Sequence, residues 1–387
     1  MYKVQTLNKI STIGLNLFPR DTYEYASEIL HPDAILVRSF NMLDMEIPES
    51  VKAIARAGAG VNNIPIEKCA NKGIVVFNTP GANANAVKEL VLLALFISSR
   101  KVYDSIAWVK SQKGKGDQVP KLVEKEKSNF EGPEIKGKKL GIVGLGAIGV
   151  MVANDALALG MEVTGYDPFI SVEAAWGLAR TVRRAISLDS LLAESDYISI
   201  HVPLNDKTKG MLNKEKFAIM KKGVRIINFA RGGLVKNADL KEAISQGIVA
   251  CHVTDFPEDD LLDIPQVVPI PHLGASTPES EENCAAMAVE QLRDYLENGN
   301  IRNSVNFPEC VLPPSGDKRI IIANKNIPNM IGQITPVLAE KNININEMLN
   351  KSKGEFAYNI IDTDSAFGDD VVGKIKAIHG VIMVRVI

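Results

Sequence analysis

A glycine-rich turn between residues 139 and 149 constrains the fold of this chain more than any other feature. Its sequence is Lys-Leu-Gly-Ile-Val-Gly-Leu-Gly-Ala-Ile-Gly, with the last three glycines at positions 144, 146 and 149. The apolar run before Gly144 predicts a buried parallel strand, and the residues from Ala147 to Leu159 predict a helix. The first glycine allows a tight turn, the second lets a ligand approach the backbone, and the third lets the helix pack closely. The sequence therefore predicts the strand, turn and helix of a nucleotide-binding α/β fold.

The residues after this turn follow in the order that dinucleotide binding requires. A second strand is predicted from Met161 to Tyr166, and Asp167 follows it directly. The diphosphate of a dinucleotide rests on a helix N-terminus, where free N–H groups and the helix dipole favour an anion. Asp167 can accept hydrogen bonds from both ribose hydroxyls, and its charge would repel a 2′-phosphate. The segment therefore predicts a site for NAD rather than NADP, and the alternative is a glycine-rich turn without function.

Length and composition limit the class of protein. A chain of 387 residues is too long for one hydrophobic core, so we expect two or three domains. The 44 basic and 46 acidic residues give a net charge of −2, which provides no field to attract nucleic acid or an anionic membrane. The four scattered cysteines form no metal-ligand pattern, so we expect reduced thiols, no metal site and a cytoplasmic protein. No apolar stretch is long enough to predict a membrane span or an export signal.

Hydrophobic periodicity divides the chain into segments. Residues 1 to about 90 predict a small α/β unit. Residues 84–99 are apolar on most faces and predict a long helix buried between domains. The polar stretch 110–139 is interpreted as a mobile connection that could also reach over a cleft. From residue 139 to 270, strands alternate with helices, which predicts a doubly wound parallel sheet with ligands at the carboxyl ends of its strands. Beyond a proline-rich linker, residues 318–387 predict a β-α-β-β-α-β pattern.

Three segments at predicted strand ends carry groups suited to hydride transfer from a hydroxy acid. Arg231, in Asn-Phe-Ala-Arg-Gly-Gly, can bind a carboxylate through two parallel hydrogen bonds, or it can form an ordinary surface ion pair. His272, in Pro-His-Leu-Gly-Ala-Ser-Thr, can remove a hydroxyl proton because imidazole titrates near neutral pH. The acidic segment 254–260, which contains Asp255, Glu258, Asp259 and Asp260, can supply a carboxylate that stabilises the protonated imidazole. Its acidic cluster can equally cap a helix, with Asp259 or Asp260 in the first turn.

Together these segments resemble the D-2-hydroxyacid dehydrogenases. The resemblance rests on the glycine-rich turn, on residues 228–233, on Asp255 with Phe256, and on residues 271–277, and it covers nearly the whole chain. It implies a Rossmann dinucleotide-binding domain inserted in a flavodoxin-like substrate-binding domain, followed by a ferredoxin-like domain. The implied boundaries are 1–92 with 286–312 for the substrate-binding domain, 93–285 for the NAD-binding domain and 317–387 for the ferredoxin-like domain.

The resemblance also implies roles for single residues. Arg231 would bind the substrate carboxylate and His272 would act as acid and base. The glutamate that orients this histidine normally lies in Glu-Glu-Pro, which is replaced here by Pro-Glu-Asp-Asp, so we choose Glu258, although Asp259 or Asp260 could serve. The residues implied around NAD are Thr79, Gly144, Gly146, Ala147, Ile148, Gly149, Asp167, Val202, Phe229, Ala230, Asp255 and Gly274. At position 147 the family commonly has an arginine, so one phosphate contact is lost here.

The N-terminal domain offers cations for the substrate. Arg38 and Arg56 each follow a predicted strand and precede a turn, and together with Asn83 they resemble the substrate-binding residues of the family. Lys88 departs from the small residue usual at its position. It either adds a positive charge to the cleft or extends its ammonium group to solvent.

The last domain resembles the ACT domain, a small regulatory module. In its serine-sensing examples a histidine and two asparagines hold the amino acid at an interface between two such domains. Asn326 and Asn344 match this pattern, and Asn324 replaces the histidine. The resemblance therefore implies L-serine as an effector at these three asparagines, and the alternative is a domain that only dimerises.

For the whole chain the resemblance implies an NAD-dependent oxidation of 3-phospho-D-glycerate to 3-phosphohydroxypyruvate, the first step of L-serine biosynthesis. The expected assembly is a homodimer or homotetramer, with 3-phosphoglycerate as its small-molecule substrate. Dehydrogenases of glycerate, glyoxylate or another 2-oxoacid are the alternatives within this class. A non-catalytic scaffold that senses NAD is the alternative from another class.

Overall fold

The computed structural model describes all 387 residues, which form two compact units. The first unit is discontinuous and combines residues 1–83 with residues 278–387, whereas the second is the uninterrupted segment 84–277. Three sheets of five, seven and four strands organise the two units. The α/β fold class predicted from the sequence is confirmed. The separation of residues 317–387 as a domain of its own stays a prediction.

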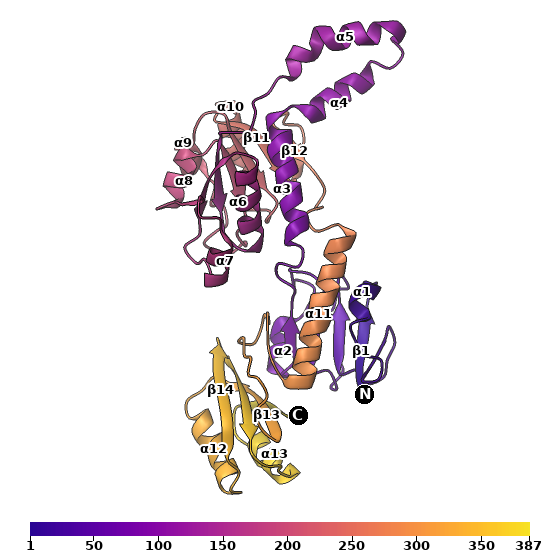
Figure 1. Cartoon of the computed structure of the whole chain (residues 1–387), viewed down its shortest axis with the longest axis vertical. Helices are drawn as coiled ribbons and strands as arrows, with labels where there is room; N and C mark the ends of the chain where they lie inside the picture. The colour runs from indigo at the N-terminus through magenta and orange to yellow at the C-terminus, as the bar shows by residue number, and fades with distance from the viewer. The chain divides into compact units, whose positions relative to one another are not determined.

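The second unit is built on a seven-stranded parallel sheet in the order β12-β11-β10-β9-β6-β7-β8 (Figure 1). The chain runs from β6 to β7 on one side and later returns to place β9 on the other side of β6. Ligands of such sheets bind at the carboxyl ends of the strands beside this switch point. The strands are β6 (Lys139–Val143), β7 (Glu162–Tyr166), β8 (Arg183–Arg184), β9 (Tyr197–Ile200), β10 (Val224–Asn228), β11 (Val249–Thr254) and β12 (Val267–Pro269).

Helices cover both faces of this sheet, so its strands are apolar on both sides. One core contains buried residues of α3 and α6, and the other contains those of α8, α9 and α10. None of the helices in the chain combines the length and the apolar character needed to cross a bilayer. The helices of this unit's body are α3 (Ala84–Ser99), α6 (Ala147–Ala158), α7 (Val172–Gly177), α8 (Leu188–Glu194), α9 (Lys214–Ala218), α10 (Asn237–Ser245) and the 3-10 helix η3 (Asp259–Leu261).

Residues 110–139, expected to form a mobile connection, are largely helical. Helices α4 (Val102–Ser111) and α5 (Val119–Glu126) form a hairpin (Figure 1). Two short 3-10 helices, η1 (Gly116–Gln118) and η2 (Lys127–Phe130), complete it. Trp108 contacts Phe130, with 5.5 Å between ring centres. The polar composition that suggested a loop is also that of an amphipathic surface helix whose lysines face solvent.

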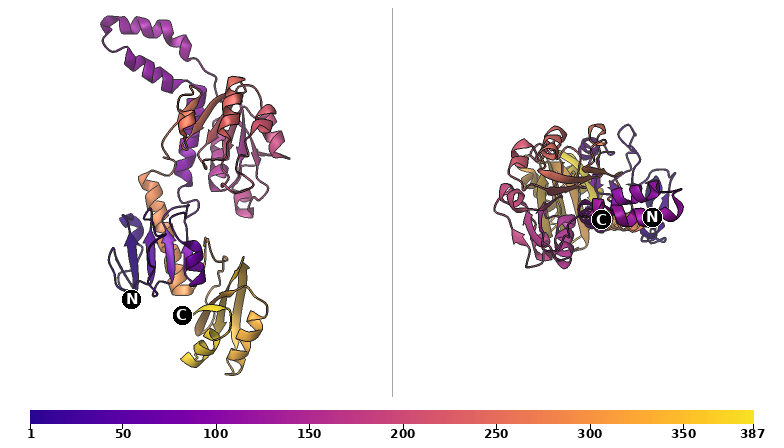
Figure 2. Two further views of the ribbon diagram at one scale, coloured as in Figure 1. Left: turned by 180° about the vertical axis from the view of Figure 1, so that it is seen from behind. Right: turned by 90° about the horizontal axis from the view of Figure 1, so that it is seen from above.

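A five-stranded parallel sheet in the order β2-β1-β3-β4-β5 begins the first unit. Helix α11 (Pro278–Asn298), drawn orange in Figure 2, covers one face together with α1 (Thr12–Leu15). Helix α2 (Ile66–Asn71) covers the other face. The side chain of Asn306 bonds to the backbone N–H of Val76 at 2.9 Å and to the carbonyl of Ile74 at 2.8 Å, so the returning chain also braces the sheet edge. The strands are β1 (Tyr2–Leu7), β2 (Tyr23–Ala26), β3 (Ala34–Val37), β4 (Ala53–Arg56) and β5 (Val75–Phe77).

The C-terminal part of the first unit is an antiparallel sheet in the order β14-β15-β13-β16, with the predicted β-α-β-β-α-β succession. Its two helices cover one face. The other face places Tyr358 and Ile360 in the same hydrophobic core as Tyr295 and Leu296 of α11. The sheet therefore depends on α11 to cover that face. The elements are β13 (Lys318–Lys325), α12 (Met330–Ala339), β14 (Ile345–Lys353), β15 (Phe356–Thr363), α13 (Asp369–Lys376) and β16 (Val381–Val386).

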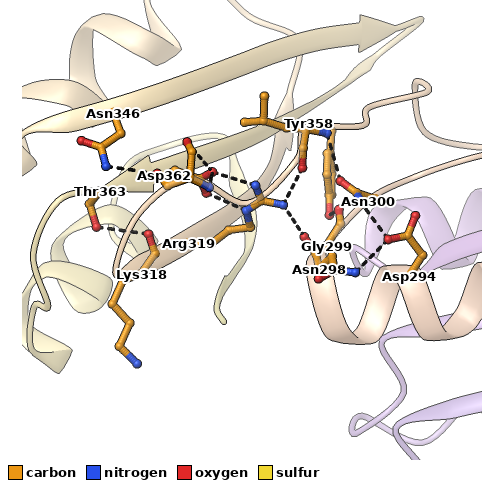
Figure 3. Close-up of polar contacts among 12 residues, drawn as sticks. Asp294, Asn298, Gly299, Asn300, Lys318, Arg319, Asn346, Tyr358, Asp362 and Thr363 are labelled. Carbon is orange, nitrogen blue, oxygen red and sulfur yellow. Dashed lines mark hydrogen bonds and ion pairs between the residues drawn. The ribbon is translucent and has the colours of Figure 1, made fainter.

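A buried ion pair joins this sheet to the end of α11 (Figure 3). Arg319 donates from Nε to Asp362 Oδ1 at 2.6 Å and from Nη2 to Oδ2 at 2.7 Å. Its Nη1 donates to the carbonyl oxygens of Asn298 at 2.8 Å and Leu312 at 2.9 Å. Burial alone would raise the pKa of Asp362, but hydrogen bonds from Arg319 and Ser315 hold it below its usual range. The side chains of Arg319 and Asp362 are only 5% and 2% exposed.

Arg319→Ala should strongly destabilise the chain because it leaves the Asp362 carboxylate buried without a counter-ion. We expect the free energy of unfolding, measured by urea titration, to fall by about 3–5 kcal/mol. Arg183→Ala is the matched control, since it removes the exposed ion pair with Glu162 and should cost about 1 kcal/mol or less. Equal losses in the two variants would contradict the role assigned to the buried pair.

Candidate active site

The glycine-rich turn joins β6 to α6 in a way that only glycine allows. Gly144 has a φ of +95°, and a Cβ atom there would lie 2.6 Å from the carbonyl oxygen of His201. A Cβ atom at Gly149 would lie 2.1 Å from the carbonyl oxygen of Gly144. Both distances are far below van der Waals contact. The tight turn and the close helix packing predicted from these two glycines are present.

The middle glycine of the turn faces open space. A Cβ atom at Gly146 would have no heavy atom within 4 Å, and Gly146 is the N-cap of α6 without any capping side chain. The N–H groups of Ala147 and Ile148 therefore lack partners at the positive end of the helix dipole. This arrangement fits the diphosphate of NAD, because backbone donors and the dipole both favour an anion there.

Asp167 is held at the end of β7, beside this turn. Its Oδ2 accepts a hydrogen bond from the N–H of Leu145, and its Oδ1 accepts one from the N–H of Phe169, both at 2.8 Å. The carboxylate is therefore oriented where the ribose of a bound dinucleotide lies in such folds. Val202, also expected at NAD, approaches the turn so closely that its Cγ1 would be 2.9 Å from a Cβ atom on Gly144.

Arg231 follows β10 in a loop braced by Asn228. The side-chain amide of Asn228 donates to the carbonyl oxygen of Arg231 at 2.9 Å, and its oxygen accepts from the N–H of Ala230 at 3.2 Å. Phe229 is buried and anchors the loop in the core. The guanidinium is exposed and donates from Nη1 to the carbonyl of Ala230 at 2.7 Å. Its remaining N–H groups can bind a carboxylate.

His272 lies close to the loop that carries Arg231. Its ring contacts the ring of Phe256, with 4.5 Å between centres and 53° between planes. Phe256 in turn packs on Gly232, where a Cβ atom would lie 3.5 Å from the Cβ of Phe256. The loops after β10, β11 and β12 therefore meet around Phe256. They bring Arg231 and His272 to the same edge of the sheet.

Asp255, directly after β11, adds a buried carboxyl group to this edge. It is 2% exposed, and neither of its oxygens accepts a hydrogen bond of normal geometry. Its Oδ2 lies 3.4 Å from the Cβ position of Gly274. Burial raises the pKa of Asp255, and His272, the amide of Gly274 and Arg231 each offset part of that increase. The sequence placed Asp255 in the acidic segment expected near the imidazole, and the family resemblance placed it at the cofactor.

The three acidic candidates for orienting His272 lie in a different environment. Asp260 forms an ion pair with Lys241 at 2.6 Å, and the hydrogen bond from this lysine lowers the pKa of Asp260. Asp259 begins η3, which agrees with the capping interpretation of the acidic cluster. Glu258 is exposed and lines a surface cavity of about 530 Å³ that His272 does not border.

The substrate-binding candidates of the first unit gather near the start of α11. Arg38, just after β3, forms an ion pair with Glu281 at 2.6 Å. Arg56, at the end of β4, donates from Nε to the carbonyl of Arg38 at 2.9 Å and from Nη1 to that of Gly60 at 2.5 Å. Both arginines lie close enough to the buried thiol of Cys284 to lower its pKa, although burial raises it overall. The two cations are thus held together by backbone and side-chain contacts.

Thr79, Asn83 and Lys88 lie in the segment that leads from β5 into α3. Thr79 is fully buried beside the thiol of Cys284, and Asn83 is half-buried. Lys88 forms an ion pair with Asp155 of α6 at 2.7 Å, and its side chain is 14% exposed. Its charge is therefore compensated within the second unit, an outcome that neither interpretation of the sequence included.

A cavity of the second unit lies away from these residues. It has a volume of about 680 Å³ and lies between the base of the α4–α5 hairpin and the strands β11 and β12, where Phe130, Cys251 and Leu262 contribute to its wall. None of the candidate site residues borders it. The site is therefore recognised by its chemistry at the strand ends and not by the size of a cavity.

The three asparagines expected to bind an effector do not meet within one chain. Asn324 is buried in β13 and accepts a hydrogen bond from Asn359 at 2.7 Å. Asn326 lies just after β13, whereas Asn344 precedes β14. In the antiparallel register the end of β13 faces the start of β15, and the start of β14 faces the end of β15. At about 3.3 Å per residue, the length of β15 separates these ends by roughly 20 Å or more.

Comparisons with known proteins agree with the geometry of the second unit. Residues 92–274 match the family described as D-isomer specific 2-hydroxyacid dehydrogenase, NAD binding domain. The D-3-phosphoglycerate dehydrogenase of Archaeoglobus fulgidus is 37% identical over 295 residues, which are 74% of this chain and 53% of that protein. The chain spans about half the length of the curated relatives that it matches.

Two solved structures share the fold. The NAD⁺-bound 3-phosphoglycerate dehydrogenase of Entamoeba histolytica has a TM-score of 0.60 at 26% identity, over 79% of this chain and 98% of that chain. A glyoxylate reductase from Paecilomyes thermophila has a TM-score of 0.63 at 26% identity, with the same coverage of both chains.

Gly146→Ala should separate dinucleotide binding from folding. No heavy atom lies within 4 Å of the new Cβ atom, so we expect the Tm of the protein without ligand to change little. The methyl group would keep a diphosphate away from the helix N-terminus, and losing one charge-assisted hydrogen bond of about 1.5–3 kcal/mol should raise the Kd for NADH at least tenfold. Fluorescence titration with NADH measures this change.

Gly373→Ala is the matched control, because Gly373 in α13 also has no heavy atom within 4 Å of its Cβ position. It should leave the Kd for NADH unchanged. A Gly146→Ala protein with native NADH affinity would show that the diphosphate does not rest on this turn.

Proposed function

Through residues 92–274 the chain belongs to the D-isomer specific 2-hydroxyacid dehydrogenases, and on that premise we propose that it oxidises 3-phospho-D-glycerate to 3-phosphohydroxypyruvate with NAD. This reaction is the first step of L-serine biosynthesis. The observation that carries the proposal is the meeting of Arg231 and His272 at the carboxyl edge of a sheet whose central strand ends in a dinucleotide-binding turn. The 37% identity to a D-3-phosphoglycerate dehydrogenase supports the choice of substrate.

The residues of the second unit divide the chemistry between them. NAD bound at the turn would accept the hydride from C2 of the hydroxy acid. His272 would take the proton of the C2 hydroxyl group, and in the reverse direction it would return that proton to the ketone oxygen. Arg231 would hold the substrate carboxylate through two hydrogen bonds and so fix the orientation of C2.

The phosphate of the substrate needs cations of its own. We assign this role to Arg38 and Arg56, which lie together in the first unit, with Asn83 as a further contact. A planar guanidinium suits a phosphate because it can donate two parallel hydrogen bonds. Thr79 keeps its proposed role at the cofactor.

The proposed location is the cytoplasm, in keeping with four cysteines that are all unpaired and buried.

Glycerate and glyoxylate are the rival substrates, since a glyoxylate reductase shares the fold. A scaffold that senses NAD without turnover is the rival from another class. The exposure of Arg231 and His272 at the sheet edge supports an enzyme, because a scaffold would have no need for either group there.

A comparison of phosphorylated and unphosphorylated substrates tests the function. We expect kcat/KM for 3-phospho-D-glycerate to exceed that for D-glycerate by roughly 100-fold, because hydrogen bonds to a charged group contribute about 1.5–3 kcal/mol each. The same preference should hold for 3-phosphohydroxypyruvate over glyoxylate in the reverse direction. NADH absorbance measures both rates.

Arg38→Gln should reduce this preference about tenfold, at the lower end of that energy range. Arg302→Gln, which removes a more exposed arginine with its own acidic partner, is the matched control and should keep the preference. Equal rates with and without the phosphate would reject 3-phosphoglycerate as substrate. NADH binding without turnover of any hydroxy acid would favour the scaffold.

We also propose that the C-terminal sheet binds L-serine between two copies of the chain. Asn326 and Asn344 lie at opposite ends of the sheet, so a single copy does not bring them to one amino acid. Two copies in opposite orientation would bring one of each together, which requires the proposed homodimer or homotetramer. Asn324 already accepts a hydrogen bond from Asn359 inside the sheet, so it would stabilise the end of β13 beside the serine instead of contacting the serine directly.

Calorimetry with L-serine tests this effector. We expect L-serine to bind with a Kd in the millimolar range or lower. Asn344→Ala should abolish this binding, because one copy contributes Asn326 and the other contributes only Asn344 to each proposed site. D-serine is the matched control ligand, since it has the same charges in the wrong arrangement. The absence of heat with L-serine at millimolar concentration would leave the sheet with a role in dimerisation alone.

A further inference from the structure

The loop that carries Arg38, residues 38–42, is held by an asparagine that follows a different strand of the same sheet. We propose that Asn8 is a positioning residue of the phosphate site, because its side chain fixes this loop in the conformation that presents Arg38 to the substrate. The inference rests on the proposed function, in which Arg38 binds the substrate phosphate. Neither the sequence patterns nor the family resemblance assigned a role to Asn8.

The topology of the five-stranded sheet places Asn8 next to Arg38. The chain passes from β1 to β2 on one side and later returns to place β3 on the other side of β1. The parallel register pairs Leu7 with Val37, which are the last residues of β1 and β3. Asn8 and Arg38 are therefore the first residues after two neighbouring strand ends. Parallel sheets bind their ligands at a switch point of this kind.

Asn8 binds the loop through the oxygen of its side chain. Its Oδ1 accepts hydrogen bonds from the backbone N–H of Ser39 at 3.2 Å and from the backbone N–H of Phe40. These two residues follow Arg38 directly, in a stretch that forms neither helix nor strand. A segment without regular structure needs such partners for its backbone groups. One oxygen thus orients the two peptide bonds that follow the arginine.

The backbone of Asn8 has a conformation that few residues adopt. Its φ is +72°, in the left-handed region. Asparagine tolerates this region better than most residues, and glycine adopts it without strain. The position therefore combines a sharp turn after β1 with an acceptor that reaches the neighbouring strand end. Glycine would provide the turn alone.

A second asparagine binds the carbonyl groups of the same loop. Asn63 donates from Nδ2 to the carbonyl oxygens of Arg38 at 3.3 Å and Phe40 at 2.7 Å. Its own carbonyl oxygen accepts a hydrogen bond from the N–H of Met42 at 2.8 Å. Asn63 thus supplies the donors for the loop, and Asn8 supplies the side-chain acceptor. The conformation of residues 38–42 depends on both.

The side chain of Arg38 is also held at its far end. Its Nη2 forms the ion pair with Glu281 at 2.6 Å, and the two side chains are 38% and 44% exposed. A guanidinium has five N–H donors, so one such contact leaves others for a phosphate. With the loop and the guanidinium both fixed, a phosphate would bind without the entropy cost of ordering them.

Asn8→Gly tests the proposal because it keeps the turn and removes the acceptor. We expect the Kd for 3-phospho-D-glycerate to rise about tenfold, since two hydrogen bonds that hold the site in place are lost. Calorimetry measures this Kd in the presence of NADH, where no turnover occurs because the cofactor is already reduced. The Kd for NADH should stay unchanged, because its proposed site lies in the second unit.

Asn342→Gly is the matched control. Asn342 also has a positive φ, of +54°, but it lies in the turn before β14, so the same chemical change leaves the loop 38–42 intact. This variant should keep the native Kd. Asn8→Asp retains both the turn and an oxygen acceptor. In hydrogen exchange of the full chain it should protect the amides of Ser39 and Phe40 as the native protein does, whereas Asn8→Gly should lose that protection.

Steady-state kinetics give a readout that a general loss of structure would not produce. In Asn8→Gly the KM for 3-phospho-D-glycerate should rise by the same factor as the Kd, while kcat stays native. D-Glycerate lacks the phosphate, so its kcat/KM should be the same in the variant and in the native protein.

Two results would overturn the proposal. A native Kd in an Asn8→Gly protein that has lost the amide protection would show that Arg38 does not need the fixed loop. Equal losses of kcat/KM with 3-phospho-D-glycerate and D-glycerate would show that Asn8 supports the structure in general. The proposed function fails separately. If Asn8→Gly weakens the binding of 3-phospho-D-glycerate to a protein that does not oxidise it, the positioning role is supported and the dehydrogenase reaction is rejected.

Discussion

The candidate active site depends on the parallel pairing of β10 with β11 and of β11 with β12. The register places Asn228 opposite Thr254 and Thr254 opposite Pro269, so the three strands end side by side. The loops that follow these strand ends start next to one another and meet around Phe256. For that reason Arg231 and His272 lie at the same edge of the sheet although they are far apart in the sequence. A slip of one residue in either pair would turn every side chain of a strand to the opposite face and separate the groups. The hydrophobic cores on both faces of the sheet fix this register.

The arrangement of the first unit depends on helix α11. Its buried side chains belong to a core shared by the five-stranded sheet and the C-terminal sheet. Tyr295 packs edge-on against Phe77 with 5.7 Å between ring centres, and its carbonyl accepts a hydrogen bond from Arg385 at 3.0 Å. Arg319 and Arg385 thus satisfy carbonyls in the last turns of the helix, which otherwise lack partners. The first turn of the same helix carries Glu281, the ion-pair partner of a proposed substrate-binding arginine, so one rigid element connects the C-terminal sheet to that arginine.

Sequence patterns located the dinucleotide turn and the strand ends because both follow local rules. A glycine is required wherever φ is positive or a helix packs on a carbonyl, and apolar runs of five residues between helices indicate buried strands. Which acidic residue of the segment after β11 is buried is not a local property. Glu258 and Asp255 are both close to Phe256 in the sequence, and only the path of the loop into η3 decides which of them is buried. The same holds for Lys88, whose partner depends on how α3 packs on α6.

The charges and amides at the strand ends act on one buried carboxyl group. Burial raises the pKa of Asp255, and the charge of His272, backbone hydrogen bonds from Gly274 and from Asp255 itself, and the charge of Arg231 each offset part of that increase. A buried carboxylate is tolerated only where such groups surround it. The loops after β10, β11 and β12 supply all of them, so the register of these three strands also determines how the carboxyl group is accommodated.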